Sequence, residues 1–309
     1  MRGKRRKRDV QEFQYRLMDN ILALHLTLKS KTYRHSSYRH FKISDPKPRD
    51  IHQASVRDRL LHHGIYRVLS PFFDKTFIHD SYSCRVGKGT HKAMSQFCAY
   101  ARKCARNHTR TCWVLKCDIR KFFASIDHAV LKGILKNCIA DADILWLLSQ
   151  VIDSFNTPCN TPTHSSMLGC SKGLPLGNLT SQLLVNVYMN EFDQFAKHKL
   201  KAAYYIRYAD DFVVLSHGKG ELTQNLRYIE GFLLKHLKLE LHTKKVFIQT
   251  FASGVDLLGW VHFPDHRVLR TSTKRRMLRR LTGAAPEETR SSYLGLLKHG
   301  NTHKLSECV

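Results

Sequence analysis

The chain has 309 residues, of which 42% are hydrophobic, so it is long and apolar enough for two or three subdomains around a shared core, and wholesale disorder is excluded. Its 51 lysines and arginines outnumber its 25 acidic residues, which gives a net charge of +26. Such an excess indicates a polyanionic partner, and nucleic acid is the first candidate because neutralised phosphates release their counterions. No window approaches the run of about 18 apolar residues that a membrane span needs, which argues against a membrane partner.

The nine cysteines form no C-x-x-C pair, which argues against a zinc site and predicts reduced thiols in a cytoplasmic protein. The basic start, residues 2–8, lacks the apolar core of a signal peptide. We interpret it as an RNA-contacting arm, with a nuclear-import patch as the alternative.

In chain order, the first predicted element is one amphipathic helix over residues 11–32, because apolar side chains recur there at helical spacing. An extended, basic stretch follows. A second helix is predicted over Val56–Leu69, stopped by Pro71. The glycine-containing loop Val86–Thr90 then leads into a helix that runs to about Cys104.

The second half begins with a strand over Cys112–Ile119 that carries an aspartate near its end. A helix is predicted over Val130–Val151, another over 180–195, and a β-hairpin over Tyr204–Leu215. The remaining predicted elements are a helix over 222–237, strands over 246–250 and 255–260, and a basic helix over 273–281 followed by a short tail. This order predicts an α+β protein.

The hairpin tip is Tyr208-Ala209-Asp210-Asp211, between two apolar runs. Adjacent carboxylates in a half-buried hairpin repel each other and need a counter-charge; a solvated turn is the alternative, since aspartate is common in turns. Asp118 also ends an apolar strand, and two strands of one sheet can bring it beside the pair. Three carboxylates so placed can hold two Mg²⁺ ions about 3.5–4 Å apart and support in-line phosphoryl transfer.

Five segments resemble, in order and spacing, motifs A to E of bacterial reverse transcriptases. They are residues 117–128, 173–182, the Tyr-Ala-Asp-Asp tip, 241–245 and 254–260. Segments at 47–49, 57–59 and 81–91 resemble the fingers motifs and the bacterial loop before motif A, so the resemblance covers about residues 40–300.

The resemblance implies a right-hand polymerase with an RRM-like palm sheet, helical fingers and a short basic helical thumb, which copies RNA into DNA. The expected organisation is a basic N-terminal arm and helix over 1–30, interleaved fingers and palm over 31–262, and a minimal thumb over 263–309.

By the same resemblance, Asp118, Asp210 and Asp211 are the catalytic acids. With Ile119 they form the expected site for two Mg²⁺ ions, and Mn²⁺ is expected to serve in vitro. Phe123, five residues after Asp118, is implied as the steric gate that admits dNTPs and excludes rNTPs.

Other roles follow from the matching positions. Packing in the core beside Phe122 is the alternative role for Phe123. Lys245 is implied as the general acid for pyrophosphate, with Lys244 equally placed by sequence. The residues implied in binding dNTP and template are Lys47, Arg49, Arg59, Ile119, Phe123, Leu176, Gly177, Gln182 and Tyr208, and those of the primer grip are Leu258, Gly259 and Trp260.

Motif B departs from the commoner pattern, with Leu176 in place of Gln and Ser181-Gln182 in place of Ser-Pro. A leucine cannot hydrogen-bond near the nucleobase, so less strict control of base-pair geometry is expected. This version is similar to the reverse transcriptases of diversity-generating retroelements, which make cDNA with errors concentrated at adenines. The implied partners are an RNA template, a DNA or RNA primer, dNTPs and a small accessory helical-bundle protein, with no membrane.

Rival interpretations remain. A retron-like or antiphage-defence reverse transcriptase would share the catalytic residues but use another template. A non-catalytic RNA-binding protein on a polymerase fold is the alternative from a different class; a decayed site would lose its repelling carboxylates first, and all three are present. Phe123 disfavours an RNA-dependent RNA polymerase. Leu176 and the absence of maturase or endonuclease segments disfavour a complete mobile-intron protein.

Overall fold

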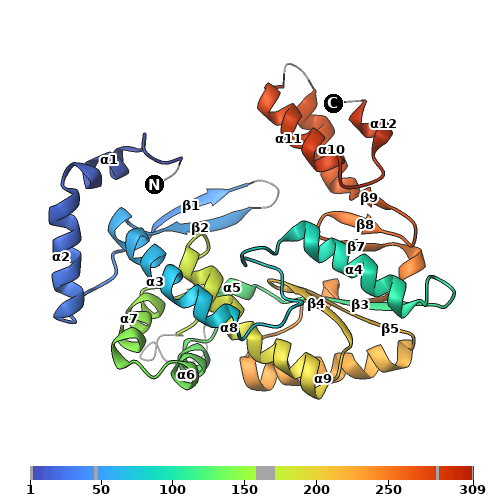
Figure 1. The fold of residues 1–309 in the computed structure, drawn as a ribbon, viewed down its shortest axis with the longest axis horizontal. Coiled ribbons are helices and arrows are strands. Elements are labelled where there is room, and N and C mark those ends of the chain that lie inside the picture. Colours follow the sequence, from blue (N-terminus) through green and yellow to red (C-terminus); the bar gives the residue numbers. More distant parts are fainter. Residues whose placement is uncertain (1–2, 45–47, 158–170, 283–284, 308) are drawn as a thin grey trace, which may run out of the picture. The chain divides into compact units, whose positions relative to one another are not determined.

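The computed structural model describes residues 3–44, 48–157, 171–282, 285–307 and 309 (Figure 1). Two compact units, each assembled from three separated stretches of the chain, make up the fold. The first unit takes Met1–Phe77, Arg120–Phe192 and Phe232–Glu240, and the second takes Ile78–Ile119, Asp193–Gly231 and Leu241–Val309. The domain boundaries expected at residues 30 and 262 stay predictions.

The first unit opens with two helices, α1 (Arg8–Tyr15) and α2 (Leu17–Lys29), so the single helix predicted over 11–32 is wrong. The chain leaves helical geometry at Arg16, with φ −115° and ψ 47°. The Asn20 side-chain amide donates to the Phe13 carbonyl at 3.0 Å, which satisfies an acceptor near the end of α1.

An antiparallel pair, β1 (Arg39–Ile43) and β2 (Arg49–Gln53), precedes α3 (Val56–Asp74). The predicted stop at Pro71 is wrong, because α3 continues through it. An internal proline costs about 3 kcal/mol or more. Burial of Leu69 and Phe73 on either side of Pro71 offsets this cost, since a fully buried side chain of this size contributes roughly 1.5–3 kcal/mol.

Further along the chain, the described part of the first unit contains the helices α5 (Phe122–Ser125), α6 (His128–Cys138) and α7 (Ala142–Asp153). The one helix predicted over Val130–Val151 is wrong. Ile139 is extended, and the Asp141 carboxylate caps α7 by accepting from two backbone N–H groups. Two longer helices, α8 (Leu179–Gln194) and α9 (Lys219–Leu237), have residues in both units.

The second unit contains a four-stranded antiparallel sheet in the order β4-β5-β3-β6. Its strands are β3 (Trp113–Asp118), β4 (Tyr204–Tyr208), β5 (Asp211–Ser216) and β6 (Phe247–Thr250), which confirms the predicted strand and hairpin. α4 (Thr90–Cys104) contributes Phe97 and Ala101 to a core shared with Ile206 and Val213 of the sheet. This core fixes the hairpin whose tip carries the paired aspartates.

A smaller sheet of β7 (Val255–Leu257), β8 (Trp260–His262) and β9 (Arg267–Leu269) follows, so the single strand predicted over 255–260 is wrong. The turn between β7 and β8 has left-handed backbone at Leu258 (φ 52°) and Gly259 (φ 90°). After the basic helix α10 (Thr271–Leu281), the predicted short tail contains α11 (Glu287–Leu297) and α12 (His303–Ser306). Their apolar side chains share a core with Trp260 and Met277. None of the helices in the described stretches has the length and apolar character to pass through a bilayer.

Candidate active site

The register of β3 and β5 places Asp118 directly opposite Asp211 at one end of the sheet. The hairpin closes through Ala209 and Asp210 between the paired residues Tyr208 and Asp211. Ala209 has left-handed backbone (φ 56°), which the tight turn requires. The sheet thus brings the three predicted aspartates to the same strand ends.

These carboxylates are electrostatically costly where they lie. Burial, together with the charges of Asp211 and Asp118, raises the pKa of Asp210 to about 6. Burial also raises the pKa of Asp211, against the lowering effects of Lys116, Lys245 and Arg270. The strand ends therefore favour binding of a cation.

Lys245 contacts one of these acids directly. Its Nζ donates to Asp118 Oδ2 at 2.7 Å. The 3₁₀ turn Thr243–Lys245 is tied to the end of β3 because the His242 N–H donates to the Asp118 carbonyl at 2.8 Å. Of the two lysines left open by the sequence, Lys245 is thus the one that contacts a predicted catalytic acid.

The donor set suits Mg²⁺, which prefers oxygen ligands and few protein carboxylates. Within the described ranges, no three Asp, Glu, His or Cys side chains are arranged closely enough to enclose one ion. One oxygen of Asp118 is engaged by Lys245, so a metal at this position would compete with the lysine. The Ile119 N–H donates to the Asp210 carbonyl at 3.3 Å, which holds Ile119 against the hairpin tip.

In the first unit, the motif A and motif B segments are bonded to each other. The Leu174 N–H donates to the Phe123 carbonyl and the Gly173 N–H to the Ile126 carbonyl, each at 2.7 Å. The buried His128 bonds through Nε2 to the Gly173 carbonyl at 2.6 Å. Phe123 is half-buried and its ring packs edge-on against Phe122, so its neighbour occupies the core more fully.

The turn that contains Leu176 is clamped to β2. The His52 N–H donates to the Leu176 carbonyl at 3.0 Å, and the Asn178 amide donates to the His52 carbonyl at 2.9 Å. The Leu176 side chain remains half-buried, and Gln182 lies in the first turns of α8. The backbone of this turn is therefore held in place without help from the side chain at position 176.

We expect Gly177→Ala to destabilise the protein by about 1–2 kcal/mol. Gly177 has φ 107°, and an added Cβ would lie 3.0 Å from Ile51 Cγ2. Urea unfolding measures the loss. Gly133→Ala is the matched control, since Gly133 lies within α6 with no atom near its Cβ position and alanine should stabilise that helix by roughly 0.5–1 kcal/mol. Equal effects of the two changes would contradict the argument.

The basic residues predicted to contact the nucleotide differ from one another in their surroundings. Arg49 is exposed at the start of β2, and Lys47 lies outside the described residues. Arg59 is engaged by α1, because its guanidinium pairs with Asp9 at 2.7 Å. The Tyr208 hydroxyl accepts from Thr90 Oγ1 at 3.2 Å while its ring packs on the sheet core.

Of the predicted primer-grip residues, Leu258 and Gly259 form the turn at the end of the β7–β8 hairpin. Trp260 is only 2% exposed and packs in the core with Met277 and Tyr293. Because the Trp260 ring is buried, the groups of this hairpin that a primer could contact are the backbone at Trp260 and the turn at Leu258 and Gly259.

A buried network behind the hairpin was not predicted. Arg207 and Asp193 are both fully buried and form a two-pronged pair, with Nε to Oδ1 at 2.8 Å and Nη2 to Oδ2 at 2.7 Å. Burial disfavours the charge of Arg207, but Asp193 outweighs that effect and raises its pKa. Arg207 also donates to the Ala209 carbonyl at 3.1 Å and to Ser81 Oγ at 3.0 Å. The only signal in the sequence was a charged residue in an otherwise apolar strand.

A four-stranded antiparallel sheet that gathers carboxylates at two adjoining strand ends is the arrangement of a nucleic-acid polymerase palm. The chain belongs to the reverse transcriptase (RNA-dependent DNA polymerase) family, which matches residues 42–295. The predicted enzyme class, RNA-directed DNA polymerase, is confirmed at the level of this family.

Named relatives are distant. Protein YkfC of Escherichia coli (strain K12) is 25% identical, over 80% of this chain and 70% of that protein. The group II intron-encoded protein LtrA of Lactococcus lactis subsp. cremoris is 22% identical, over 84% of this chain and 51% of LtrA. The chain thus spans about half the length of that intron-encoded relative.

Solved telomerase structures share the fold. Apo telomerase from Candida tropicalis is 11% identical with a TM-score of 0.58, over 92% of this chain and 57% of that one. Telomerase from Candida albicans, in complex with a TWJ fragment of telomeric RNA, is 9% identical with a TM-score of 0.56, over 91% and 56%. With the family match, this confirms the predicted α+β, right-hand polymerase class.

Proposed function

We propose that this protein extends a DNA or RNA primer on an RNA template with dNTPs, as the error-prone reverse transcriptase of a diversity-generating retroelement. The observation that carries the polymerase proposal is the placement of Asp118 opposite Asp211, with Asp210 beside them at the hairpin tip. Two Mg²⁺ ions bound there would activate the primer hydroxyl and neutralise the triphosphate.

The chain's own residues supply the remaining chemistry. Lys245 holds its ammonium group at the Asp118 carboxylate, from which it could turn to donate a proton to pyrophosphate. The motif A segment carries Phe123 as the proposed gate, and the clamped turn carries Leu176 as the proposed base-pair neighbour. A side chain without hydrogen-bonding groups at position 176 supports the error-prone subtype.

The test is primer extension on an RNA template with Mg²⁺ and dNTPs, followed by sequencing of the products. We expect cDNA that disappears on chelation with EDTA and in an Asp210→Ala/Asp211→Ala variant, with errors mainly opposite template adenines. Accurate cDNA would contradict the retroelement subtype and favour a retron-like or antiphage reverse transcriptase. No cDNA, even with the cognate RNA and neighbouring gene products added, would leave an RNA-binding protein.

A small helical-bundle accessory protein and a cytoplasmic location are part of the same proposal. The accessory protein is tested by adding the products of neighbouring genes to the extension assay. If the products became longer while the rate of single-nucleotide addition stayed the same, the accessory protein would act on processivity.

We expect Phe123→Ala to relax the choice of sugar. Removing the ring opens space for a 2′-hydroxyl, so the preference for dNTP over rNTP in kcat/KM should fall by at least about tenfold, as lost steric exclusion is worth roughly 1–3 kcal/mol. Single-nucleotide addition measures both substrates. Phe122→Leu is the control, because Phe122 is the more buried core neighbour and its change should affect stability rather than sugar choice. Unchanged selectivity in Phe123→Ala would assign the ring to packing.

A further inference from the structure

A basic surface lies at the end of the four-stranded sheet that is remote from the carboxylates. The loop of residues 105–112 joins α4 to β3, and Trp113 pairs with Ser216 on one side and Thr250 on the other, whereas Asp118 pairs with Asp211. Five residue steps at about 3.3 Å separate the two ends of β3 by roughly 17 Å. A group bound at this loop is therefore not in the proposed catalytic site.

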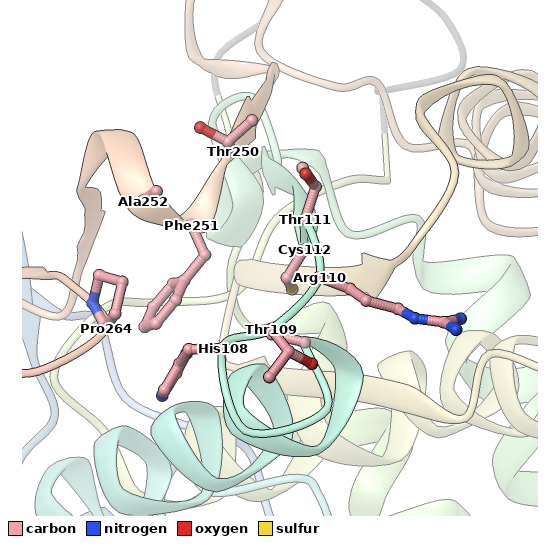
Figure 2. Close-up of a pocket in the computed structure, with 10 residues that line it drawn as sticks. His108, Thr109, Arg110, Thr111, Cys112, Thr250, Phe251, Ala252 and Pro264 are labelled. Atoms are coloured by element: carbon pink, nitrogen blue, oxygen red, sulfur yellow. The ribbon is translucent and has the colours of Figure 1, made fainter.

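This end of the sheet holds a pocket of about 330 Å³ (Figure 2). The residues that line it are Ala105, His108, Thr109, Arg110, Thr111, Cys112, Thr250, Phe251, Ala252 and Pro264, and none of these ten is acidic. Figure 2 shows His108, Phe251 and Pro264 gathered on one side, while the Arg110 side chain extends the other way. The His108 and Phe251 rings are nearly parallel, at 17° with centroids 6.1 Å apart. The pocket thus combines an aromatic wall with a cationic edge.

Positive charge is concentrated around the pocket. Residues 102–110 include four exposed cations, Arg102, Lys103, Arg106 and Arg110, and no acid. Lys219 adds another at the same strand end, with its Nζ 5.3 Å from the centre of the Trp113 ring. The nearby acids are Glu221, which accepts from Ser216, and Asp265, which follows Pro264 in the chain. The cations outnumber them, so the surface favours a polyanion.

The loop backbone is held in a strained conformation. Arg106, Asn107 and His108 are consecutive left-handed residues, with φ of 46°, 56° and 66°. Asn and His tolerate this conformation better than most residues, so the cost of about 1–2 kcal/mol applies mainly to Arg106. The Asn107 N–H donates to the Arg102 carbonyl at 2.9 Å, and Arg102 Nε donates to Asn107 Oδ1 at 3.0 Å. Strain of this kind persists where the surroundings fix it, and it often marks a binding site.

We infer that this pocket binds a segment of single-stranded nucleic acid, as a contact separate from the polymerase site. Arg106 and Arg110 bind phosphate oxygens, since guanidinium groups match phosphate geometry. The Thr111 hydroxyl supplies a neutral donor beside them, whereas the Thr109 hydroxyl donates to the Arg106 carbonyl at 2.7 Å. A base stacks on the exposed ring of His108, behind which Phe251 is buried, and any base can do so because each has a π-face. The combination of aromatic wall and cationic edge favours nucleic acid over an acidic peptide.

The test measures binding of a fluorescent 12-nucleotide oligo(U) by the full chain without Mg²⁺ or dNTPs, so loss of polymerisation cannot confound it. Arg106→Gln/Arg110→Gln should weaken binding about tenfold and reduce the slope of log K against log salt by about 1.4, or roughly 0.7 for each phosphate contact of a single strand. The control Lys199→Gln/Lys235→Gln removes the same charge from exposed positions elsewhere. Equal losses of binding in the two double variants would mean that net charge alone explains the effect, which would overturn the inference.

A second variant separates stacking from charge. His108→Asn keeps a residue that tolerates left-handed backbone and removes the ring, so binding should fall about fivefold with an unchanged salt slope. Crosslinking with 4-thiouridine oligomers should modify residues 102–112 or 249–264, and a thiothymidine DNA arm identifies which strand binds. Crosslinks confined to other peptides would overturn the inference, whatever the polymerase assay shows.

Discussion

Asp210→Asn is expected to abolish primer extension while making the folded protein more stable. Asp210 is half-buried beside two other carboxylates, and this burial and their charges raise its pKa to about 6. Removing its charge relieves repulsion in the folded state, so the free energy of unfolding should rise by about 1 kcal/mol. The same change removes one of the proposed metal ligands, so single-dNTP addition should fall by at least about 10²–10³-fold.

Urea unfolding and single-nucleotide addition measure the two effects on the same preparation. Asp265→Asn is the matched control, because Asp265 is exposed in the same unit and its change should leave both quantities as they are. A variant that loses stability together with activity would show that Asp210 is an ordinary structural carboxylate. Activity within tenfold of the native protein would remove Asp210 from the proposed catalytic set.

The sequence was most informative where the signal was local. The apolar runs on both sides of the Asp210–Asp211 pair predicted the hairpin, because alternation and turn chemistry are properties of neighbouring residues. The strand before Asp118 was predicted for the same reason. Pairing of Asp118 with Asp211 depends on register, which the apolar strands and the short turn together specify.

The wrong predictions arose where a local sequence pattern indicated one course of the helix and tertiary contacts imposed another. Helical spacing persists across Arg16 and across Ile139, yet the chain breaks at both, with Asn20 and Asp141 bonding near the new helix ends. The proline stop failed because burial around Pro71 outweighs its cost. The spacing of apolar residues does not show whether a continuous or a broken helix packs better in the folded protein.

Sequence spacing also could not choose between Lys244 and Lys245. The 3₁₀ turn over Thr243–Lys245 decides which side chain contacts Asp118, and such a short turn has no periodic signature. Partners distant in sequence present the same difficulty. Asp193 lies 14 residues before Arg207, near the end of a helix, so nothing local indicates that the two form a buried pair.

Arg207→Met is expected to destabilise the protein by about 3–5 kcal/mol, because Asp193 would remain buried without its partner. Asp193→Leu should cost a similar amount, since it leaves the buried arginine uncompensated. Arg227→Met is the matched control, because Arg227 is exposed in the same unit and its loss should change the free energy of unfolding by less than about 0.5 kcal/mol.

The double variant Arg207→Met/Asp193→Leu separates stability from positioning. With neither charge buried, it should regain at least about 2 kcal/mol of the loss expected from adding the single changes. Arg207 also donates to the Ala209 carbonyl, so the hairpin tip still loses a hydrogen bond that helps to hold its left-handed turn. We therefore expect kcat to stay about tenfold low while KM for dNTP is little changed, as for misplaced reacting groups. If the double variant recovered full activity with its stability, Arg207 would serve folding alone; if kcat stayed low in the refolded variant, the buried arginine positions the aspartates.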